Sequence, residues 1–274
     1  MDDVKYSVLM SVYSRENAAF FRDAMNSIWV QTIPADDFVL VCDGPLTTEL
    51  DEVISEMEKA HSDILQIIRL KENSGLSNAL NEGMKHCKNE LIARMDSDDI
   101  SCPDRCEKQL KIFHEDPETD LCSGNVIEFA DSIDHITGKR ELPETNDEII
   151  AFSRKRNPFN HPAVMYKKTA VEAAGGYSGE YPLFEDYYLW IRMLMNGSRG
   201  RNIAETILYM RTPGDFYMRR GGKKYAKDML AFHRWMKDEG WITNRTYVSG
   251  AVPHAVICVV PNSLRKAAYR ILHT

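Results

Sequence analysis

The stretch LIARMDSDD, residues 91–99, places three aspartates directly after a mostly apolar run. Its first five residues predict a short strand inside the protein, because strands covered on both faces read as nearly continuous apolar runs. Asp96, Asp98 and Asp99 then lie where this strand ends. Carboxylates so close together repel one another unless a cation neutralises them, and oxygen ligands suit Mg²⁺ or Mn²⁺. The stretch therefore indicates a buried strand that ends in a divalent metal site, with a solvated acidic turn as the alternative.

Segments with the patterns of strands and helices alternate on both sides of this stretch. Apolar runs predict strands over 6–12, 38–42 and 64–70, and helical spacing predicts helices over 18–29, 49–60, 76–87 and from Pro103 onward. Ser14 is the expected N-cap of the first helix. Further along we expect a hairpin over 127–139, a strand over 158–166 and a helix over 184–195. This order predicts the α/β class, with a Rossmann-like, mostly parallel, doubly wound sheet.

Polar residues follow three of the predicted strands at the point where each strand ends. They are Ser11-Val12-Tyr13, Asp43-Gly44 and the acidic run that begins at Asp96. In open α/β sheets the carboxyl ends of parallel strands meet at one edge, and ligands bind there. The sequence therefore predicts that these three segments converge on a single site.

The composition excludes several classes of protein. The 274 residues are 43% hydrophobic and 27% charged, which argues against disorder and allows one large domain. A formal net charge of −7 argues against nucleic acid as a partner, because that requires a basic surface. The six cysteines form no C-x-x-C pair, so we expect reduced thiols in a cytoplasmic protein. Cys102 and Cys106 lie one helical turn apart, and we expect them to serve packing rather than zinc binding.

Signals for secretion, membrane spans and other nucleotide sites are missing from the sequence. The acidic start Met1-Asp2-Asp3 does not fit a secretory signal. The apolar run 251–260 is shorter than the roughly 20 residues that span a bilayer, so we expect a soluble or at most peripheral protein. Neither the P-loop pattern nor the dinucleotide fingerprint G-x-G-x-x-G occurs.

Five motifs in order resemble the family-2 glycosyltransferases, which have the GT-A fold. They are SVY at 11–13, VCDG at 41–44, NSGLS at 73–77, RMDSDD at 94–99 and ED at 185–186. The resemblance extends from about residue 6 to about residue 210. The stretches NHPAVMY at 160–166 and FEDYYLW at 184–190 are similar to the non-processive bacterial branch that builds exopolysaccharide or capsule repeat units. The Q-x-x-R-W signature of processive synthases does not occur.

The resemblance implies a donor site at the ends of the strands. The edge Ser11, Val12, Tyr13 and the carboxylate of Asp43 would hold the nucleotide base, with Asp43 accepting a hydrogen bond from a uracil ring nitrogen. Asn73 and Gly75 would shape the loop beside that base.

The phosphate side of this donor site falls on the acidic stretch. Arg94 and Asp96 would face the ribose and the phosphates. Asp98 would bind the Mn²⁺ or Mg²⁺ ion that bridges the donor diphosphate. Many family members carry an arginine where this chain has Leu80, so the basic contact from that helix is missing here.

The resemblance places the acceptor side at the acidic pair 185–186. Asp186 would be the catalytic base, because an inverting transfer needs a carboxylate that removes the proton of the attacking hydroxyl. Glu185 would contact an acceptor hydroxyl, and His161 would line the acceptor pocket. The alternatives are an acidic pair favoured by the dipole of a helix N-terminus and a structural histidine.

Together these observations predict an inverting hexosyltransferase that moves a hexose or N-acetylhexosamine from a UDP-sugar to a glycan, and the acceptor is expected to be lipid-linked. A catalytically silent nucleotide-sugar or glycan-binding relative is the alternative. A sugar nucleotidyltransferase is disfavoured, because residues 11–16 contain no glycine after the first strand.

The chain divides into two predicted parts. Residues 1–215 form the GT-A catalytic domain, and residues 216–274 form a smaller, basic, mainly helical extension. The basic cluster over 219–227 would act either as a lid over the donor diphosphate or as a contact with anionic lipid at the inner face of the cell membrane. Residues 262–274 have the pattern of a short interfacial helix or of a helix docked on the domain.

Overall fold

The computed structural model describes residues 4–212 and 222–259. Its first part repeats one unit, a strand followed by a helix, as the sequence predicts. The elements are β1 (Tyr6–Val12), α1 (Ala18–Trp29), β2 (Asp37–Cys42), α2 (Thr48–His61), β3 (Leu65–Arg69), α3 (Leu76–His86) and β4 (Leu91–Met95).

The second part is less regular and contains longer strands. The elements are β5 (Ile100–Ser101), α4 (Arg105–Glu115), β6 (Thr119–Phe129), β7 (Ile136–Arg140), α5 (Asn146–Phe152), the 3₁₀ helix η1 (His161–Ala163), β8 (Met165–Lys167), α6 (Lys168–Ala173), α7 (Glu185–Met195) and β9 (Arg199–Arg211). The predicted hairpin exists as the antiparallel pair β6–β7, and the helix predicted over 184–195 is α7.

One sheet runs through both parts, in the order β3-β2-β1-β4-β8-β6-β9-β5, with β7 paired to β6. The first four strands are parallel, with Val12 opposite Cys42 and Met10 opposite Met95. Beyond β4 the sheet is mixed, because β8 is antiparallel to both β4 and β6. The carboxyl ends of β1, β2 and β4 therefore meet at one edge, as expected.

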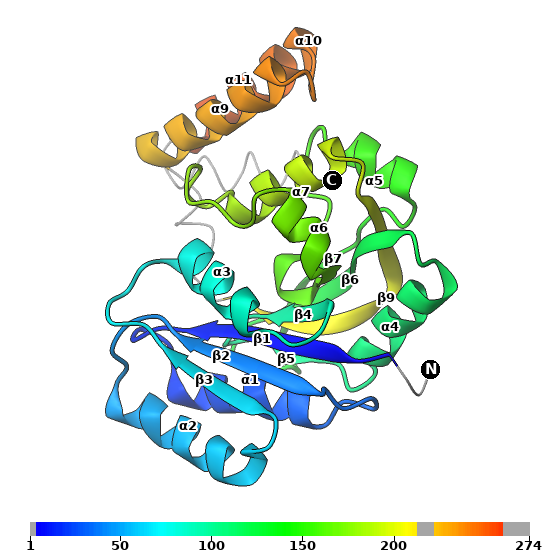
Figure 1. The fold of residues 1–274 in the computed structure, drawn as a ribbon. Coiled ribbons are helices and arrows are strands. Elements are labelled where there is room, and N and C mark those ends of the chain that lie inside the picture. The colour runs from blue at the N-terminus through cyan, green and yellow to red at the C-terminus, as the bar shows by residue number, and fades with distance from the viewer. Residues whose placement is uncertain (1–3, 213–221, 260–274) are drawn as a thin grey trace.

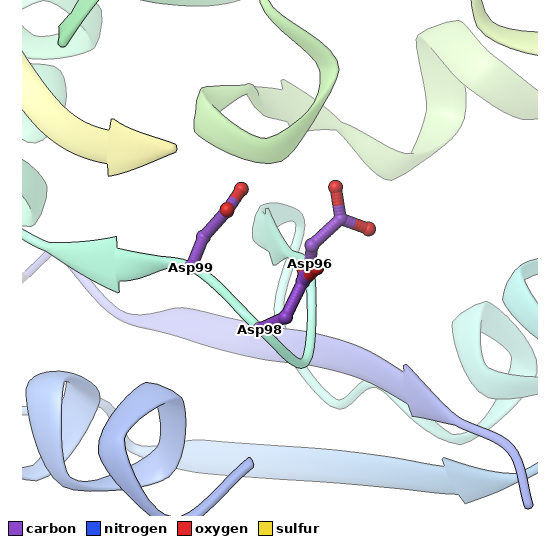
Figure 2. A group of neighbouring side chains, drawn as sticks. All are labelled: Asp96, Asp98 and Asp99. Carbon is purple, nitrogen blue, oxygen red and sulfur yellow. The ribbon is translucent and has the colours of Figure 1, made fainter. Parts of the chain in front are cut away.

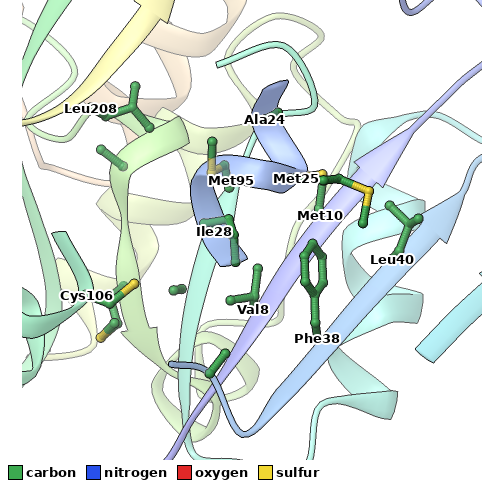
Figure 3. Packing of buried hydrophobic residues seen from close by; sticks show 14 of the residues in the cluster. Val8, Met10, Ala24, Met25, Ile28, Phe38, Leu40, Met95, Cys106 and Leu208 are labelled. Atoms are coloured by element: carbon green, nitrogen blue, oxygen red, sulfur yellow. The ribbon is translucent and has the colours of Figure 1, made fainter. Parts of the chain in front are cut away.

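Helices cover both faces of this sheet, with α1 and α2 on one side and α3 on the other (Figure 1). Successive side chains of β1 alternate between two cores: Val8 packs with α1 and α2, and Leu9 packs with α3 and α7. Figure 3 shows the first core, where Ile28 of α1 lies over the sheet residues Val8 and Phe38. Removing a large buried side chain from such a core costs about 2–5 kcal/mol.

The helix α3 lies unusually close to the sheet. A Cβ atom at Gly83 would overlap the Leu9 side chain and would lie 2.7 Å from Val41 Cγ2. Glycine at this position lets the helix approach β1 and β2 closely. The loop before α3 is thereby held near the end of β2, where the predicted site lies.

Two local predictions are wrong. The N-cap of α1 is Asn17 rather than Ser14, since Asn17 Oδ1 accepts from Ala19 N at 2.9 Å and from Phe20 N at 3.2 Å. The strand predicted over 158–166 is mostly a loop and η1, and β8 begins only at Met165. Pro162 cannot donate to a ladder, which disfavours a longer strand here.

The final described segment is a helical hairpin. It consists of α9 (Lys223–Asp238), α10 (Asn244–Thr246), the π-helix η2 (Tyr247–Ala251) and α11 (Val252–Val259), which packs along α9 (Figure 1). Phe232 and Met236 of α9 pack against Tyr187 and Ile191 of α7.

Of the predicted basic cluster, Lys223, Lys224 and Lys227 lie on α9. Arg219, Arg220, the boundary at 215 and the segment 262–274 lie outside the described residues. No helix within 4–212 or 222–259 is both long and apolar enough to cross a membrane.

Candidate active site

Three carboxylates gather in the turn between β4 and β5. Asp96, Asp98 and Asp99 each place one carboxylate oxygen so that all three oxygens lie within 4.8 Å of one another. Figure 2 shows these side chains projecting from a single tight turn. Asp99 is only 1% exposed, and its Oδ2 has no hydrogen-bond partner in the described part of the chain.

The carboxylates of this turn carry more negative charge than the nearby positive groups neutralise. Burial raises the pKa of Asp98 to about 7, and the charges of Asp96 and Glu16 add to the rise. Burial and the two neighbouring aspartates also raise the pKa of Asp99 well above its usual range. Glu16 is held beside the turn because its Oε2 accepts from the Ser97 hydroxyl at 2.7 Å. An oxygen-rich cluster of this kind suits a hard divalent cation.

Arg211, at the end of β9, fixes the acidic turn from the other side. Its backbone N–H donates to Asp99 Oδ1 at 2.7 Å, and its Nε donates to the Asp98 carbonyl at 3.0 Å. Its guanidinium lies over the rings of Phe20 and Phe129, at 3.8 Å and 4.5 Å from their centroids. The contacts orient the turn and place one positive charge beside it.

Arg94 is buried beneath the turn, with 1% of the residue exposed. It forms an ion pair with Asp96, while its Nε and Nη1 have no hydrogen-bond partner among residues 4–212 and 222–259. The N–H groups of a buried guanidinium normally all have hydrogen-bond partners in a folded protein, and these two nitrogens lack one within the described residues. Arg94 lies next to Asp96 near the end of β4, and its contact with the donor stays a prediction.

The end of β2 organises the loop before α3. The carboxylate of Asp43 accepts from Ser74 N at 2.7 Å and from Gly75 N at 3.0 Å, and Asn73 Nδ2 donates to the Asp43 carbonyl at 3.2 Å. A Cβ atom at Gly44 would lie 2.6 Å from Asn73 N, so the loop packs directly on that glycine. Asp43 thus fixes the loop, in addition to the predicted contact with a base.

The end of β1 lies beside this loop. Asp43 N donates to the Val12 carbonyl at 2.8 Å, which joins the ends of the two strands. Val12 is buried, Ser11 is half-buried and Tyr13 is 42% exposed, so the Tyr13 ring borders the edge where a base would bind. Leu80 is fully buried in the core behind the loop.

The acidic pair lies at the start of α7. Asp186 Oδ2 accepts from Asn157 Nδ2 at 2.7 Å, and Oδ1 accepts from Tyr187 N at 2.7 Å. Burial raises the pKa of Glu185, although backbone N–H groups hydrogen-bond to its carboxylate. Leu183, two residues earlier, has φ +69°, a left-handed conformation that is rare for leucine and occurs often at functional sites.

Tyr177 is a buried residue whose hydroxyl is influenced by charges from several of the predicted site residues. Burial raises the pKa of Tyr177 above its usual range, the Arg94 charge opposes this, and the charges of Asp186 and Asp96 add to it. These groups therefore lie within electrostatic reach of one hydroxyl, which brings residues from β4 and α7 together. His161 Nε2 is 3.0 Å from the same hydroxyl, and burial together with the Arg94 charge lowers its pKa well below the usual range. Both effects favour the uncharged form of the His161 ring.

Residues far apart in the sequence meet at this edge, and several were not expected. Glu16, Asn157, Tyr177 and Arg211 carry no motif that marks them. Only Asp99 had a visible signal, as the last member of the acidic run. A separate polar cavity of about 310 Å³, lined by residues such as Asp116, lies near the amino-terminal ends of β6 and β9 and contains none of the predicted residues.

Comparison with known sequences identifies the family. The sequence model of glycosyl transferase family 2 matches residues 7–173. An uncharacterized glycosyltransferase of Haemophilus influenzae is 42% identical over 224 residues, which is 82% of each chain. The UDP-Gal:alpha-D-GlcNAc-diphosphoundecaprenol beta-1,3-galactosyltransferase of Escherichia coli is 33% identical over 269 residues, covering 98% of this chain and 96% of that protein. The amylovoran biosynthesis glycosyltransferase AmsE of Erwinia amylovora is 36% identical and covers 88% of this chain and 90% of its own length.

Solved structures show the same fold at low sequence identity. The mannosyltransferase PcManGT from Pyrobaculum calidifontis, in complex with GDP-Man and Mn²⁺, superposes with a TM-score of 0.66 at 16% identity, covering 98% of this chain and 80% of that one. The TarS protein of S. aureus, in complex with UDP-GlcNAc, gives a TM-score of 0.63 at 16% identity and covers 86% and 67% of the two chains. With its strand-end site and these relatives, the chain belongs to glycosyl transferase family 2 and has the GT-A fold.

Proposed function

We propose that this glycosyltransferase transfers a hexose or N-acetylhexosamine from a UDP-sugar to a glycan acceptor, with inversion at the anomeric carbon. The observation that carries the proposal is the cluster of three carboxylates at the end of β4, together with the acidic pair at the start of α7. The acidic turn 96–99 lies at the end of β4, and Asp186 lies within charge reach of the same Tyr177 hydroxyl. The first group suits a diphosphate-bound cation, and the second suits a base.

The residues of the acidic turn fit a divalent cation. The turn offers only carboxylate oxygens as ligands, and one of these, Asp99 Oδ2, is buried without a hydrogen-bond partner among the described residues. Burial, together with the charges of Asp96 and Glu16, raises the pKa of Asp98. Asp98 would hold Mn²⁺ or Mg²⁺, which when bound supplies positive charge to the departing diphosphate. Arg94 and Asp96 would orient the ribose and phosphates, and Arg211 would keep the turn in place.

The donor base would lie between the ends of β1 and β2. The ring of Tyr13 and the Ser11-Val12 edge offer a surface for it, and the Asp43 carboxylate offers an acceptor for a uracil N–H. The loop at Asn73 and Gly75 would close the other side, because Asp43 holds that loop by two backbone N–H groups.

Asp186 would remove the proton from the acceptor hydroxyl as its oxygen attacks the anomeric carbon. Its carboxylate is held by Asn157, so its orientation is fixed before the acceptor arrives. Glu185 would receive a second acceptor hydroxyl. His161 would contribute as an uncharged wall of the acceptor pocket, because burial lowers its pKa.

The names of the relatives support a role in bacterial surface polysaccharide synthesis. One is a galactosyltransferase that uses UDP-Gal and an acceptor linked to diphosphoundecaprenol, and another acts in amylovoran biosynthesis. By analogy the acceptor of this chain would be lipid-linked. The enzyme would then act on the cytoplasmic side, at the inner face of the cell membrane, with the basic C-terminal region in peripheral contact with lipid.

Calorimetric titration with UDP, GDP and dTDP tests the donor site, each with Mn²⁺ and again with a chelator. We expect UDP to bind with Mn²⁺ and to lose most of its affinity in the chelator. The Asp98→Asn variant should behave with Mn²⁺ as the wild type does with the chelator. If GDP or dTDP binds as tightly as UDP, the proposal of a UDP-sugar donor is wrong. If no nucleotide binds, the proposed donor site is wrong.

A further inference from the structure

The C-terminal hairpin has an inner face of small residues. Ala251, Ala255 and Cys258 of η2 and α11 are buried against Ala226 and Met229 of α9. Small side chains let the two helices pack closely. The side of η2 and α11 that faces α9 is buried in this contact. Among the described residues, the outward side of that helix takes no part in this contact with α9.

The outward side is a stripe of valines. Val248, Val252, Val256 and Val259 follow one another at spacings of four, four and three residues, and they are 62%, 39%, 57% and 49% exposed. Such spacing places side chains on one face of a helix. No lysine, arginine, aspartate or glutamate occurs from 247 to 259. A helix that is apolar on both sides normally has both sides covered, so the valine stripe is a surface for a partner.

Positive charge surrounds one end of the valine stripe. Gly222 N donates to the Cys258 carbonyl at 2.8 Å, so the start of α9 lies beside the end of α11. The first two turns of α9 carry three exposed lysines, Lys223, Lys224 and Lys227. Residues 216–274 contain eleven lysines and arginines against three aspartates and glutamates, although the whole chain has a net charge of −7.

We propose that the valine stripe and the three lysines of α9 dock on an anionic lipid bilayer. Valines inserted below the headgroups would remove apolar surface from water, and the lysines would pair with anionic headgroups beside them. A second copy of the chain suits this surface less well. It would bring together two segments that each carry an excess of positive charge, which disfavours association.

This docking would place the proposed acceptor site near the lipid. The ring of Phe184 lies 5.5 Å from Tyr225 and 5.4 Å from Phe232, both on α9, and Phe184 directly precedes the acidic pair. The basic end of the hairpin is thus next to the start of α7. This docking rests on the proposed function, because it names the residues that would make the peripheral lipid contact proposed there. Vesicle binding is measured without transfer of sugar, so a failure of one is distinguishable from a failure of the other.

Co-sedimentation of the full chain with vesicles tests the proposal without donor or acceptor. Wild-type protein should bind vesicles of phosphatidylcholine with phosphatidylglycerol more tightly than vesicles of phosphatidylcholine alone. Replacing the three lysines with glutamine should weaken binding roughly fivefold for each lysine. The Val252→Asp/Val256→Asp variant should weaken it by at least about tenfold. These side chains are exposed, so both variants should fold, which circular dichroism checks.

Matched controls lie elsewhere on the surface. Val30 is 63% exposed, so Val30→Asp should bind vesicles like the wild type, as should glutamine at Lys59, Lys85 and Lys111. Transfer to a water-soluble acceptor should be unchanged in the Val252→Asp/Val256→Asp variant. This assay therefore distinguishes a failure of the proposed sugar transfer from a failure of lipid binding. Wild-type protein that ignores anionic vesicles, or stripe variants that bind like wild type, would overturn the proposal. So would a dimer in solution that the valine variant dissociates, because a second copy would then cover the stripe.

Discussion

Replacing Asp98 with asparagine should stabilise the metal-free protein while it abolishes metal-dependent nucleotide binding. Asp98 is a carboxylate without enough counter-charge, since burial and the neighbouring Asp96 and Glu16 raise its pKa to about 7 from an ordinary value of 3.8. Asparagine has nearly the same shape and carries no charge. The variant therefore removes the repulsion and retains the packing of the turn.

The expected size follows from the pKa of Asp98 in the two states. A rise of the Asp98 pKa from 3.8 to about 7 corresponds to about 4 kcal/mol at neutral pH. Asp98 is not fully buried, and water screens part of this, so we expect about 2 kcal/mol. Because the folded protein holds the Asp98 proton more tightly than the unfolded chain does, wild-type stability falls as the pH rises from about 4 to about 7. The Asp98→Asn variant lacks the part of this fall that Asp98 contributes.

Chemical denaturation in the presence of a chelator measures the effect. The variant should match the wild type near pH 4 and exceed its free energy of unfolding by about 2 kcal/mol above about pH 7. Adding Mn²⁺ should stabilise the wild type and leave the variant unchanged. A variant that is less stable than the wild type at neutral pH would refute the view that Asp98 is an uncompensated carboxylate.

Three further substitutions test the other parts of the site. Arg211→Ala should lower the free energy of unfolding by about 3 kcal/mol, through loss of the bond to the Asp98 carbonyl and of the aromatic contacts; denaturation within about 0.5 kcal/mol of wild type would contradict this. Gly44→Ala should weaken UDP binding about tenfold in calorimetry, because its Cβ would lie 2.6 Å from Asn73 N. Gly197→Ala has a similar φ with open space around it, so it should leave UDP affinity unchanged. Asp186→Asn should lower kcat by roughly 10²–10⁴-fold and leave UDP binding intact, and steady-state transfer kinetics would disprove the base if kcat stayed near wild type.

The sequence predicted the elements whose patterns are local. β1, β2 and β4 are mostly apolar runs, and the polar residues after them mark one edge of the sheet without knowledge of any contact. The acidic turn was visible for the same reason. The family resemblance added roles for Asp98 and Asp186 that composition and spacing alone left open.

The remaining features depend on contacts between distant residues. Arg211 meets Asp99 across 112 positions, and Asn157 meets Asp186 across 29, so nothing near either residue reveals the partner. The strand predicted over 158–166 was wrong because Pro162 cannot donate to a strand ladder, and β8 begins only at Met165. The valine stripe was hidden because a helix that is apolar on both sides reads as buried, and only the structure shows which side α9 covers.

Transfer of sugar itself tests the central claim most directly. The enzyme would be incubated with UDP-hexoses and UDP-N-acetylhexosamines, a lipid-diphosphate-linked sugar acceptor and Mn²⁺, and the product linkage would be assigned by NMR. We expect release of UDP in step with a product of inverted anomeric configuration, and loss of both in a chelator and in Asp186→Asn. A product with retained configuration, or transfer that proceeds unchanged in the chelator, would contradict the central claim.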